Sequence, residues 1–326
     1  MKSRPTSSPT PRSGERELPF ASLQGLLSPV VGKGLVCLIL LLLLSPWDQD
    51  FAQYTQAWHK LPWLSFMTRS IFEQGTWGAT DGPTLILVAC VLTYVCGGRR
   101  LAQKAPDLYI KLGFVSLGSL WIAVVVHLIK GASQRPRPYQ VYDQGLPFHP
   151  FYDLNAWTFH GWGHGSFPSG HTATMMSLLT FAYVLPRQGQ RKILAVLVGL
   201  SALVMAFSRI AVGAHWLTDT GASILLVLLC CELLYSVILK VPEHLAHVHA
   251  GRTYPKDLLY WELKLFPRLV FGIMIPLLPV LVWSAYRNPV ILGLSLLGAL
   301  LLFWLFIKDL GNVQLKHLSS WTGDSV

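Results

Sequence analysis

The chain has 326 residues, of which 52% are hydrophobic and only 13% are charged. Soluble domains carry about 25% charged residues, so this composition and the mean hydropathy of +0.46 argue against a soluble enzyme. They predict an all-α fold, a polytopic membrane protein with one helical bundle. The formal net charge of +10 does not indicate a nucleic-acid partner, because no basic run is long and most lysines and arginines flank apolar segments.

The N-terminal residues 1–28 are rich in Ser, Pro and Arg, which predicts a disordered cytoplasmic tail. The first long apolar run begins too late for a typical cleaved secretory signal. The five cysteines lie in or beside apolar segments and have no metal-ligand spacing. They indicate small buried hydrophobic side chains rather than a disulfide framework.

Six apolar segments predict a membrane core over residues 29–240. The spans are expected at residues 26–44, 83–96, 108–129, 171–186, 193–207 and 216–239. The second span is short. Between the first two, residues 51–82 are too polar to cross a membrane, and fit either an interfacial amphipathic helix or a segment packed against the bundle.

The C-terminal region, residues 241–326, consists of a connector and two additional predicted spans, 269–285 and 290–307. The connector, 241–266, carries His244, His247 and His249. These histidines have no acidic or cysteine partner in a clear ligand pattern, so a solvated loop is favoured over a metal site.

The distribution of Lys and Arg predicts the orientation of the bundle. Basic residues are concentrated in the N-terminal tail, in the connectors after the second, fourth and sixth spans, and at the C-terminus. Eight spans place all of these in the cytoplasm. The opposite end then faces outward. The compact size and the lack of a disulfide pattern favour a bacterial inner membrane, with that end facing the periplasm.

Three segments on the predicted outward side carry polar residues that a membrane core does not need. They are Lys130–Pro138, Phe167–His171 and Ser208–Asp219. If the last is helical, His215 and Asp219 lie on one face, and the carboxylate can hold one imidazole nitrogen while the other stays free. Each feature alone has a structural explanation: Lys130 at the interface, Ser169 as a helix cap, an Arg–Asp pair as a link between helices. Together they bring two histidines, several cations and a helix N-terminus to one membrane depth, an arrangement that holds phosphate.

The spacing of these residues resembles that of the type 2 phosphatidic acid phosphatase superfamily. Three blocks match in order, and three spaced blocks are far more specific than one short motif. The blocks are Lys130/Arg137/Pro138, Pro168/Ser169/Gly170/His171 and Ser208/Arg209/His215/Asp219. The resemblance covers residues 83–240 and implies a six-helix phosphatase core of the integral-membrane lipid phosphate phosphatase branch.

The resemblance also implies a role for each residue. His215 would be the nucleophile that forms a phosphohistidine, Asp219 would accept from its other nitrogen, and His171 would be the general acid and then the base. Phosphate oxygens would be gripped by Lys130, Arg137, Ser169, Gly170 and Arg209. No Asp/Glu cluster suits Mg²⁺, so we expect a metal-independent reaction without a cofactor.

Two features near the blocks stay open to more than one interpretation. The spacing from Lys130 selects Arg137 over Arg135, so Arg135 is interpreted as a solvated charge rather than a second phosphate contact. Residues 139–167 are rich in aromatic residues and fit an interface belt with partial substrate contact, or a lid. His160 and His164 within it are weak metal-ligand candidates.

The expected function is hydrolysis of a lipid-linked phosphate or diphosphate at the outer membrane face. Undecaprenyl diphosphate, phosphatidic acid, phosphatidylglycerol phosphate and lipid A are all compatible substrates. Two alternatives remain: a lipid phosphotransferase with the same phosphohistidine, and a non-enzymatic anion-binding membrane protein or transporter. A phosphatase that acts on a soluble sugar phosphate is a third alternative.

Overall fold

The computed structural model describes residues 19–56, 58, 61–62, 80–157 and 165–250. Within these ranges the chain is helical and contains no strand, which confirms the predicted all-α bundle. Residues 1–18 of the expected tail, most of the expected interfacial segment, and the two expected C-terminal spans lie outside the described residues. Residues 19–28, expected to be disordered with the rest of the tail, form the start of a helix instead.

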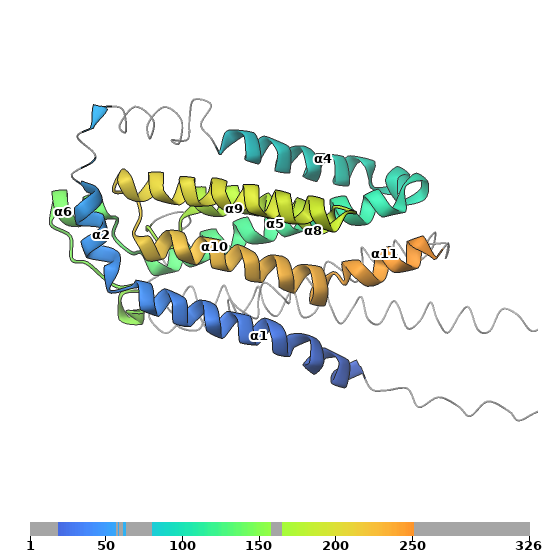
Figure 1. Ribbon diagram of the computed structural model, residues 1–326, viewed down its shortest axis with the longest axis horizontal. Coiled ribbons are helices and arrows are strands. Elements are labelled where there is room, and N and C mark those ends of the chain that lie inside the picture. Colours follow the sequence, from blue (N-terminus) through green and yellow to red (C-terminus); the bar gives the residue numbers. More distant parts are fainter. Residues whose placement is uncertain (1–18, 57, 59–60, 63–79, 158–164, 251–326) are drawn as a thin grey trace, which may run out of the picture.

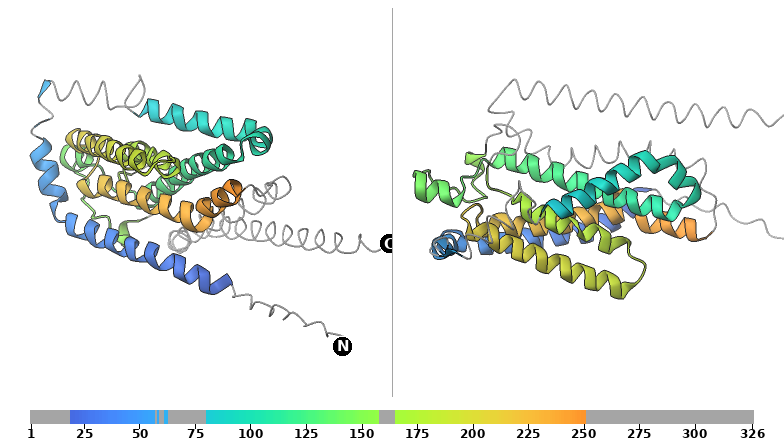
Figure 2. Two further views of the ribbon diagram at one scale, coloured as in Figure 1. Left: turned by 45° about the vertical axis from the view of Figure 1, so that its right-hand side comes forward. Right: turned by 90° about the horizontal axis from the view of Figure 1, so that it is seen from above.

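The helices run back and forth along one axis (Figures 1 and 2). In chain order they are α1 (Pro19–Leu44), α2 (Trp47–Gln56), α4 (Asp81–Lys104), α5 (Pro106–Ser133), α6 (Pro138–Gln144), the 3-10 turn η2 (Leu154–Ala156), α7 (Gly170–Ser177), α8 (Leu179–Val184), α9 (Gln188–Ala211), α10 (Leu217–Glu232), the π-helical turn η3 (Leu233–Ile238) and α11 (Val241–His249). Helix α5 is central: it packs against α4, α7, α8 and α10.

Among the described residues, three helical stretches are long and apolar enough to cross a membrane, and they correspond to the third, fifth and sixth predicted spans. They are Pro106–Gln144, Gln188–Ala211 and Leu217–Ile238. The first predicted span joins α2 through a bend of 59° to make a fourth candidate. Pro46, which has no N–H to continue the helix, stands at this bend.

The second and fourth predicted spans differ from expectation. Helix α4 starts at Asp81 and is longer than predicted, but only its Asp81–Tyr94 part is apolar. The fourth is divided at Leu178 into α7 and α8, of eight and six residues. Helix α7 is thus a short element at the end of the bundle, and its N-terminus is available to the polar residues gathered there.

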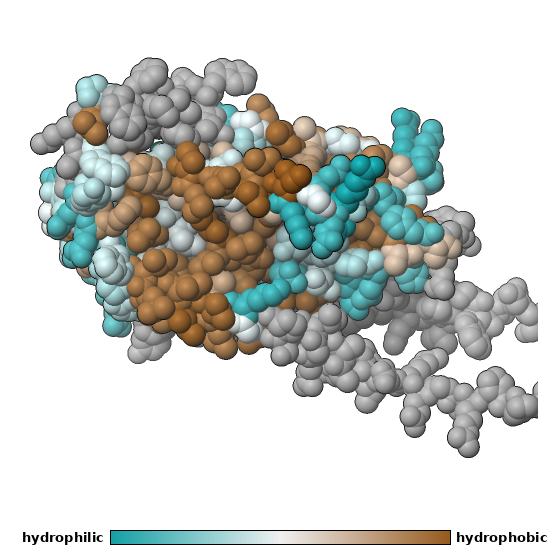
Figure 3. All heavy atoms as spheres, in the orientation of Figure 1, coloured by the Kyte–Doolittle hydropathy of each residue, from teal (hydrophilic) through white to brown (hydrophobic). Residues whose placement is uncertain are grey.

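The surface of the bundle carries an apolar belt between two polar ends (Figure 3). Leucine and valine side chains of α1, α4 and α9 are exposed on it, as expected where a helix faces lipid rather than water. The interior is filled by large side chains such as Trp121, Phe114 and Tyr109 of α5. The exposed belt and the apolar helices identify an integral membrane protein.

Two segments that the sequence left open or predicted as a loop are part of the packed structure. Helix α2 buries Asp48, Ala52 and Thr55, so residues 51–56 pack against the bundle instead of lying free at the interface. The connector after residue 240 begins as helix α11 and not as a loop. Its His249 lies 3.2 Å from a carboxylate oxygen of Asp107, an acidic partner that the sequence spacing did not reveal.

Candidate active site

The three polar segments meet at the end of the bundle that holds α2 and α6 (Figure 1). Backbone hydrogen bonds join them in pairs: Ser166 N donates to Arg135 O at 2.8 Å, Tyr139 N to Gly213 O at 3.1 Å, and Ser169 N to Asp219 O at 3.0 Å. Their relative positions are therefore fixed by the main chain.

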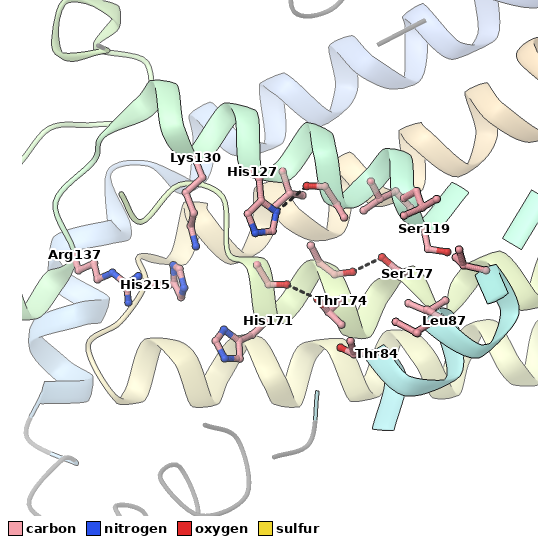
Figure 4. Close-up of a pocket in the computed structure, with 18 residues that line it drawn as sticks. Thr84, Leu87, Ser119, His127, Lys130, Arg137, His171, Thr174, Ser177 and His215 are labelled. Carbon is pink, nitrogen blue, oxygen red and sulfur yellow. Dashed lines mark hydrogen bonds between the residues drawn. The ribbon is translucent and has the colours of Figure 1, made fainter. Parts of the chain in front are cut away.

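A cavity of about 410 Å³ opens between these segments. It is lined at its polar end by Lys130, Arg137, Gly170, His171 and His215. In Figure 4 the side chains of Lys130, Arg137 and His215 point toward one another, and His171 lies beside them. The structure thus brings five of the eight predicted site residues to one wall of the same cavity.

Lys130 stands in the last turn of α5, where a cation is favoured by the negative end of the helix dipole. Its side chain reaches across to the N-terminus of α7, because a Cβ atom placed on Gly170 would lie 3.8 Å from its Nζ. An ammonium group and the free backbone N–H groups of a helix N-terminus therefore face the same space, which suits an anion.

His215 precedes α10 and is not in a helix, so the condition under which the sequence placed His215 and Asp219 on one helix face is not met. Its Nδ1 lies 2.8 Å from Ser166 O and 3.5 Å from Asp219 Oδ2. Because a carbonyl oxygen only accepts, Nδ1 carries the proton, and Nε2 has a free lone pair. The nearer partner is thus a backbone carbonyl, and Asp219, which was expected to accept from this nitrogen, is the more distant one.

The surroundings of His215 keep its imidazole neutral. The side chain is almost fully buried, and this burial lowers the pKa of His215 to about 4, which the nearby Asp219 only partly offsets. A neutral imidazole with an exposed lone pair on Nε2 is the form that can attack phosphorus.

His171 occupies the first turn of α7. Its Nε2 is buried and, within the described part of the chain, has no hydrogen-bond partner. The charges of Arg209, Lys130 and Arg137 act on this ring. A phosphate dianion placed among these cations would favour a proton on His171, because it supplies the opposite charge.

Ser169, Arg209 and Asp219 lie behind the cavity wall. The Ser169 hydroxyl accepts a hydrogen bond from Thr172 Oγ1 at 3.0 Å, and Ser169 is fully buried. Arg209 is 6% exposed, and its carbonyl accepts from the backbone N–H groups of Ala214 and His215, which closes the turn that carries the nucleophile candidate. Ser169 and Arg209 thus lie close to the cavity, where they support the residues that line it.

Arg135 is the main departure from the sequence interpretation: it is not a solvated charge but 2% exposed. Its Nη1 donates to Asp219 Oδ1 at 2.6 Å and its Nη2 to Asp48 Oδ2 at 2.7 Å. The rings of Phe148 and Trp216 lie 5.3 and 5.4 Å from the guanidinium carbon. Burial is tolerated because both the charge and the planar faces of the guanidinium are satisfied.

The aromatic segment that precedes α7 packs on the bundle where it is described. Phe148 contacts Trp216 with ring centroids 4.8 Å apart, and Phe151 stacks on Phe167 at 5.4 Å. Neither residue lines the cavity. His160 and His164 lie outside the described residues, and within the described ranges there is no group of three or more His, Cys, Asp or Glu side chains that could hold a metal ion.

Sequence reasoning missed Asp48, Thr218 and Ser166. Ser166 acts through its carbonyl, which no side-chain pattern reveals. Asp48 gave one signal, a carboxylate directly after a membrane span, where an unpaired charge is costly.

Residues 109–242 match the model of the PAP2 superfamily, the type 2 phosphatidic acid phosphatases. This part of the chain, which is less than half of its length, is similar to the PAP2 superfamily. The PAP2 segment contains all three motif blocks, whereas α1, α2 and α4 precede it. The match supports a lipid phosphatase in general.

A search of solved structures found the transmembrane PAP2-type phosphatidylglycerolphosphate phosphatase of Bacillus subtilis. It is 20% identical, and the match covers 69% of this chain and 97% of that chain, with a TM-score of 0.39. A likeness this distant says nothing about the substrate of the PAP2 segment described above. Curated protein sequences gave no match.

Proposed function

We propose that the protein is a membrane phosphatase that hydrolyses a lipid-linked phosphate or diphosphate through a phosphohistidine. One observation carries the proposal: the free Nε2 of His215 shares a cavity with Lys130, Arg137 and the N-terminus of α7. A nucleophile and a set of phosphate-binding cations thus face the same volume.

In the proposed first step, the Nε2 lone pair of His215 forms a bond to phosphorus and the bond to the leaving oxygen breaks. His171 gives its proton to that oxygen. In the second step water attacks phosphorus, His171 takes a proton from the water, and the N–P bond breaks to return the lone pair to Nε2. Lys130, Arg137 and the Gly170 amide stabilise the charge on the nonbridging oxygens in both steps. None of these steps requires a metal ion.

The remainder of the cavity supports a lipid substrate. It extends along three turns of α5 from Lys130 to Ser119, about 16 Å at 1.5 Å per residue. Leu87, Val88 and Val91 of α4 form its far side. The hydroxyls of Thr84, Thr174 and Ser177 donate to carbonyls of their own helices, so they present little polarity to the cavity. A hydrocarbon chain suits such a wall.

We further propose that the site faces outward, toward the periplasm of a bacterial inner membrane. The turns between α4 and α5 and between α8 and α9 lie at the end of the bundle opposite α2 and α6 (Figure 1). These turns and the helix ends beside them carry Arg100, Lys104, Arg187, Arg191 and Lys192. Basic connectors favour the cytoplasm, which leaves the site on the other face.

The test is phosphate release by the purified protein in detergent micelles from a panel of lipid phosphates and diphosphates, with and without EDTA. We expect release that EDTA does not reduce, and a protein-bound phosphate that acid quenching destroys and alkali preserves. His215→Ala should abolish both signals, while His247→Ala, an exposed residue of α11, should leave both unchanged.

Other outcomes would favour the alternatives. A phosphorylated lipid product without free phosphate would identify a phosphotransferase. Binding of lipid phosphate without turnover, unaffected by His215→Ala, would identify an anion-binding protein. Release from soluble sugar phosphates alone would exclude a lipid substrate. Loss of activity in EDTA, restored by a metal ion, would overturn metal independence.

A further inference from the structure

Asp48 of α2 lies outside the PAP2 segment, yet it is fully buried beside the candidate active site. Its carboxylate accepts three hydrogen bonds. Thr218 N donates to Oδ1 at 2.8 Å, and Oδ2 accepts from Thr218 Oγ1 at 2.6 Å and from Arg135 Nη2 at 2.7 Å. It therefore caps the N-terminus of α10 and pairs with the cation that holds Asp219.

One guanidinium thus serves two buried carboxylates. Arg135 Nη1 also donates to Thr218 Oγ1 at 2.8 Å, and Nε donates to the carbonyl of His149 at 2.8 Å. The Thr218 hydroxyl accepts from Arg135 and donates to Asp48, so every member of the cluster is hydrogen-bonded. With one positive and two negative charges, the cluster of Asp48, Arg135 and Asp219 is net negative.

The negative cluster lies on the Nδ1 side of His215, opposite the Nε2 atom that is proposed to attack phosphorus. Asp219 Oδ2 accepts from Trp216 N at 2.8 Å and lies 3.5 Å from His215 Nδ1. As Nε2 forms its bond to phosphorus, positive charge develops on the imidazole ring, and a negative cluster on the Nδ1 side stabilises it. If Asp48 were neutral, the net charge of the cluster would be zero, and this stabilisation would be weaker.

We propose that Asp48 is a positioning residue for His215, acting through Arg135 and Asp219, and that α2 is therefore part of the catalytic unit. The proposal rests on the phosphohistidine mechanism proposed above. A positioning role for Asp48 predicts a kinetic effect that a purely structural role for Asp48 would not produce. Formation of the phosphohistidine places positive charge on the ring and needs the negative cluster, whereas its hydrolysis removes that charge and does not.

The test is rapid acid-quench and alkali-quench kinetics of Asp48→Asn with a labelled lipid phosphate. The amplitude of labelled protein counts the active sites and corrects for unfolded material. We expect formation of the phosphohistidine to slow at least about tenfold, by analogy with the groups that orient a metal-ligating histidine from behind. Hydrolysis of the intermediate should stay within about threefold of wild type, since the loss is confined to one step.

Asp50→Asn is the matched control, because it removes the same charge from an exposed position of the same helix and should change neither step. If Asp48→Asn folds poorly, Thr218→Val removes the hydroxyl contacts to Asp48 and Arg135 without removing a charge, and should slow formation alone by a smaller factor. Equal slowing of both steps, or wild-type kinetics in both variants, would overturn the proposal. Persistence of labelled protein in His215→Ala would instead overturn the proposed function.

Discussion

The two consecutive Arg-Pro pairs of this chain should respond in opposite ways to the same substitution. Arg135 is buried between Asp48 and Asp219, both fully inaccessible to solvent, whereas Arg137 is half-buried and lines the cavity. Arg135→Met removes the cation and leaves two carboxylates buried without it. Arg137→Met removes a proposed phosphate contact and leaves no such carboxylate among the described residues.

The size of the effect follows from these contacts. Removing one partner of a buried ion pair costs roughly 3–5 kcal/mol, because the other charge remains in a low-dielectric interior. In a domain of this size 1 kcal/mol corresponds to about 2–4 °C in Tm, so Arg135→Met should lower the Tm by about 10 °C. Arg137→Met should change the Tm by less than about 2 °C and lower kcat/KM by about 100-fold or more, as when one transition-state donor is removed.

The assay is thermal unfolding in detergent, followed by tryptophan fluorescence, together with phosphate release at a temperature where both variants are folded. Arg137→Met controls for loss of an arginine at this end of the bundle, and Arg135→Met controls for loss of a cation near the cavity. A wild-type Tm for Arg135→Met would refute the interpretation of Arg135 as the centre of a buried charge cluster. Equal losses of Tm in both variants would refute the distinction between them.

Three further predictions concern the histidines and one glycine. His171→Ala should slow hydrolysis of a lipid phosphate by about 10²–10⁴-fold but slow p-nitrophenyl phosphate much less, since that leaving group needs no proton; equal losses on both substrates would argue against a general acid. The pKa of His215, lowered by burial from 6.5 to about 4, means that the unfolded chain binds this proton first as the pH falls. Neutral His215 therefore does not reduce the free energy of unfolding above pH 6.5. As the pH falls from 6.5 toward 4, protonation of this residue in the unfolded chain lowers the free energy of unfolding by roughly 3 kcal/mol. His215→Asn should flatten the fall of Tm in this window, and an unchanged slope would contradict the shift. Gly165 has φ +85°, and a Cβ there would lie 3.0 Å from Lys130 O, so Gly165→Ala should cost about 1–3 kcal/mol. It should also lower activity by displacing the adjacent Ser166 carbonyl; the glycine of a surface turn, Gly145→Ala (φ +71°, open space), should cost stability but spare activity.

The sequence was sufficient to predict the membrane bundle and the residues that line the polar end of the cavity. Hydropathy determines which segments enter lipid, because an apolar helix in the membrane needs no particular partner to satisfy its backbone. Lys130, Arg137, Gly170, His171 and His215 could be selected because charged or special residues at span ends are costly without a function. Their spacing within three blocks then indicated a phosphate site.

The sequence was insufficient wherever a residue's role depends on what lies across the fold. Arg135 and Arg137 are two residues apart and equivalent in a pattern, yet one enters the interior and the other the cavity. The difference is set by Asp48, which is 87 positions earlier in the chain and is brought to Arg135 only when α2 packs on α10. Likewise, the partner of His215 Nδ1 is a backbone carbonyl, which is present at every position and so leaves no signal.

The residues that touch the proposed substrate are thus readable from the sequence, because their chemistry is unusual for their place in a membrane protein. The residues that orient them were decided by tertiary structure. A buried charge is stable only in one geometry, with its opposite charge and hydrogen bonds in reach, and that geometry exists only after α2, α5 and α10 have come together. In this protein the motif identifies His215 as the nucleophile candidate, and the fold decides which of its two ring nitrogens carries the proton.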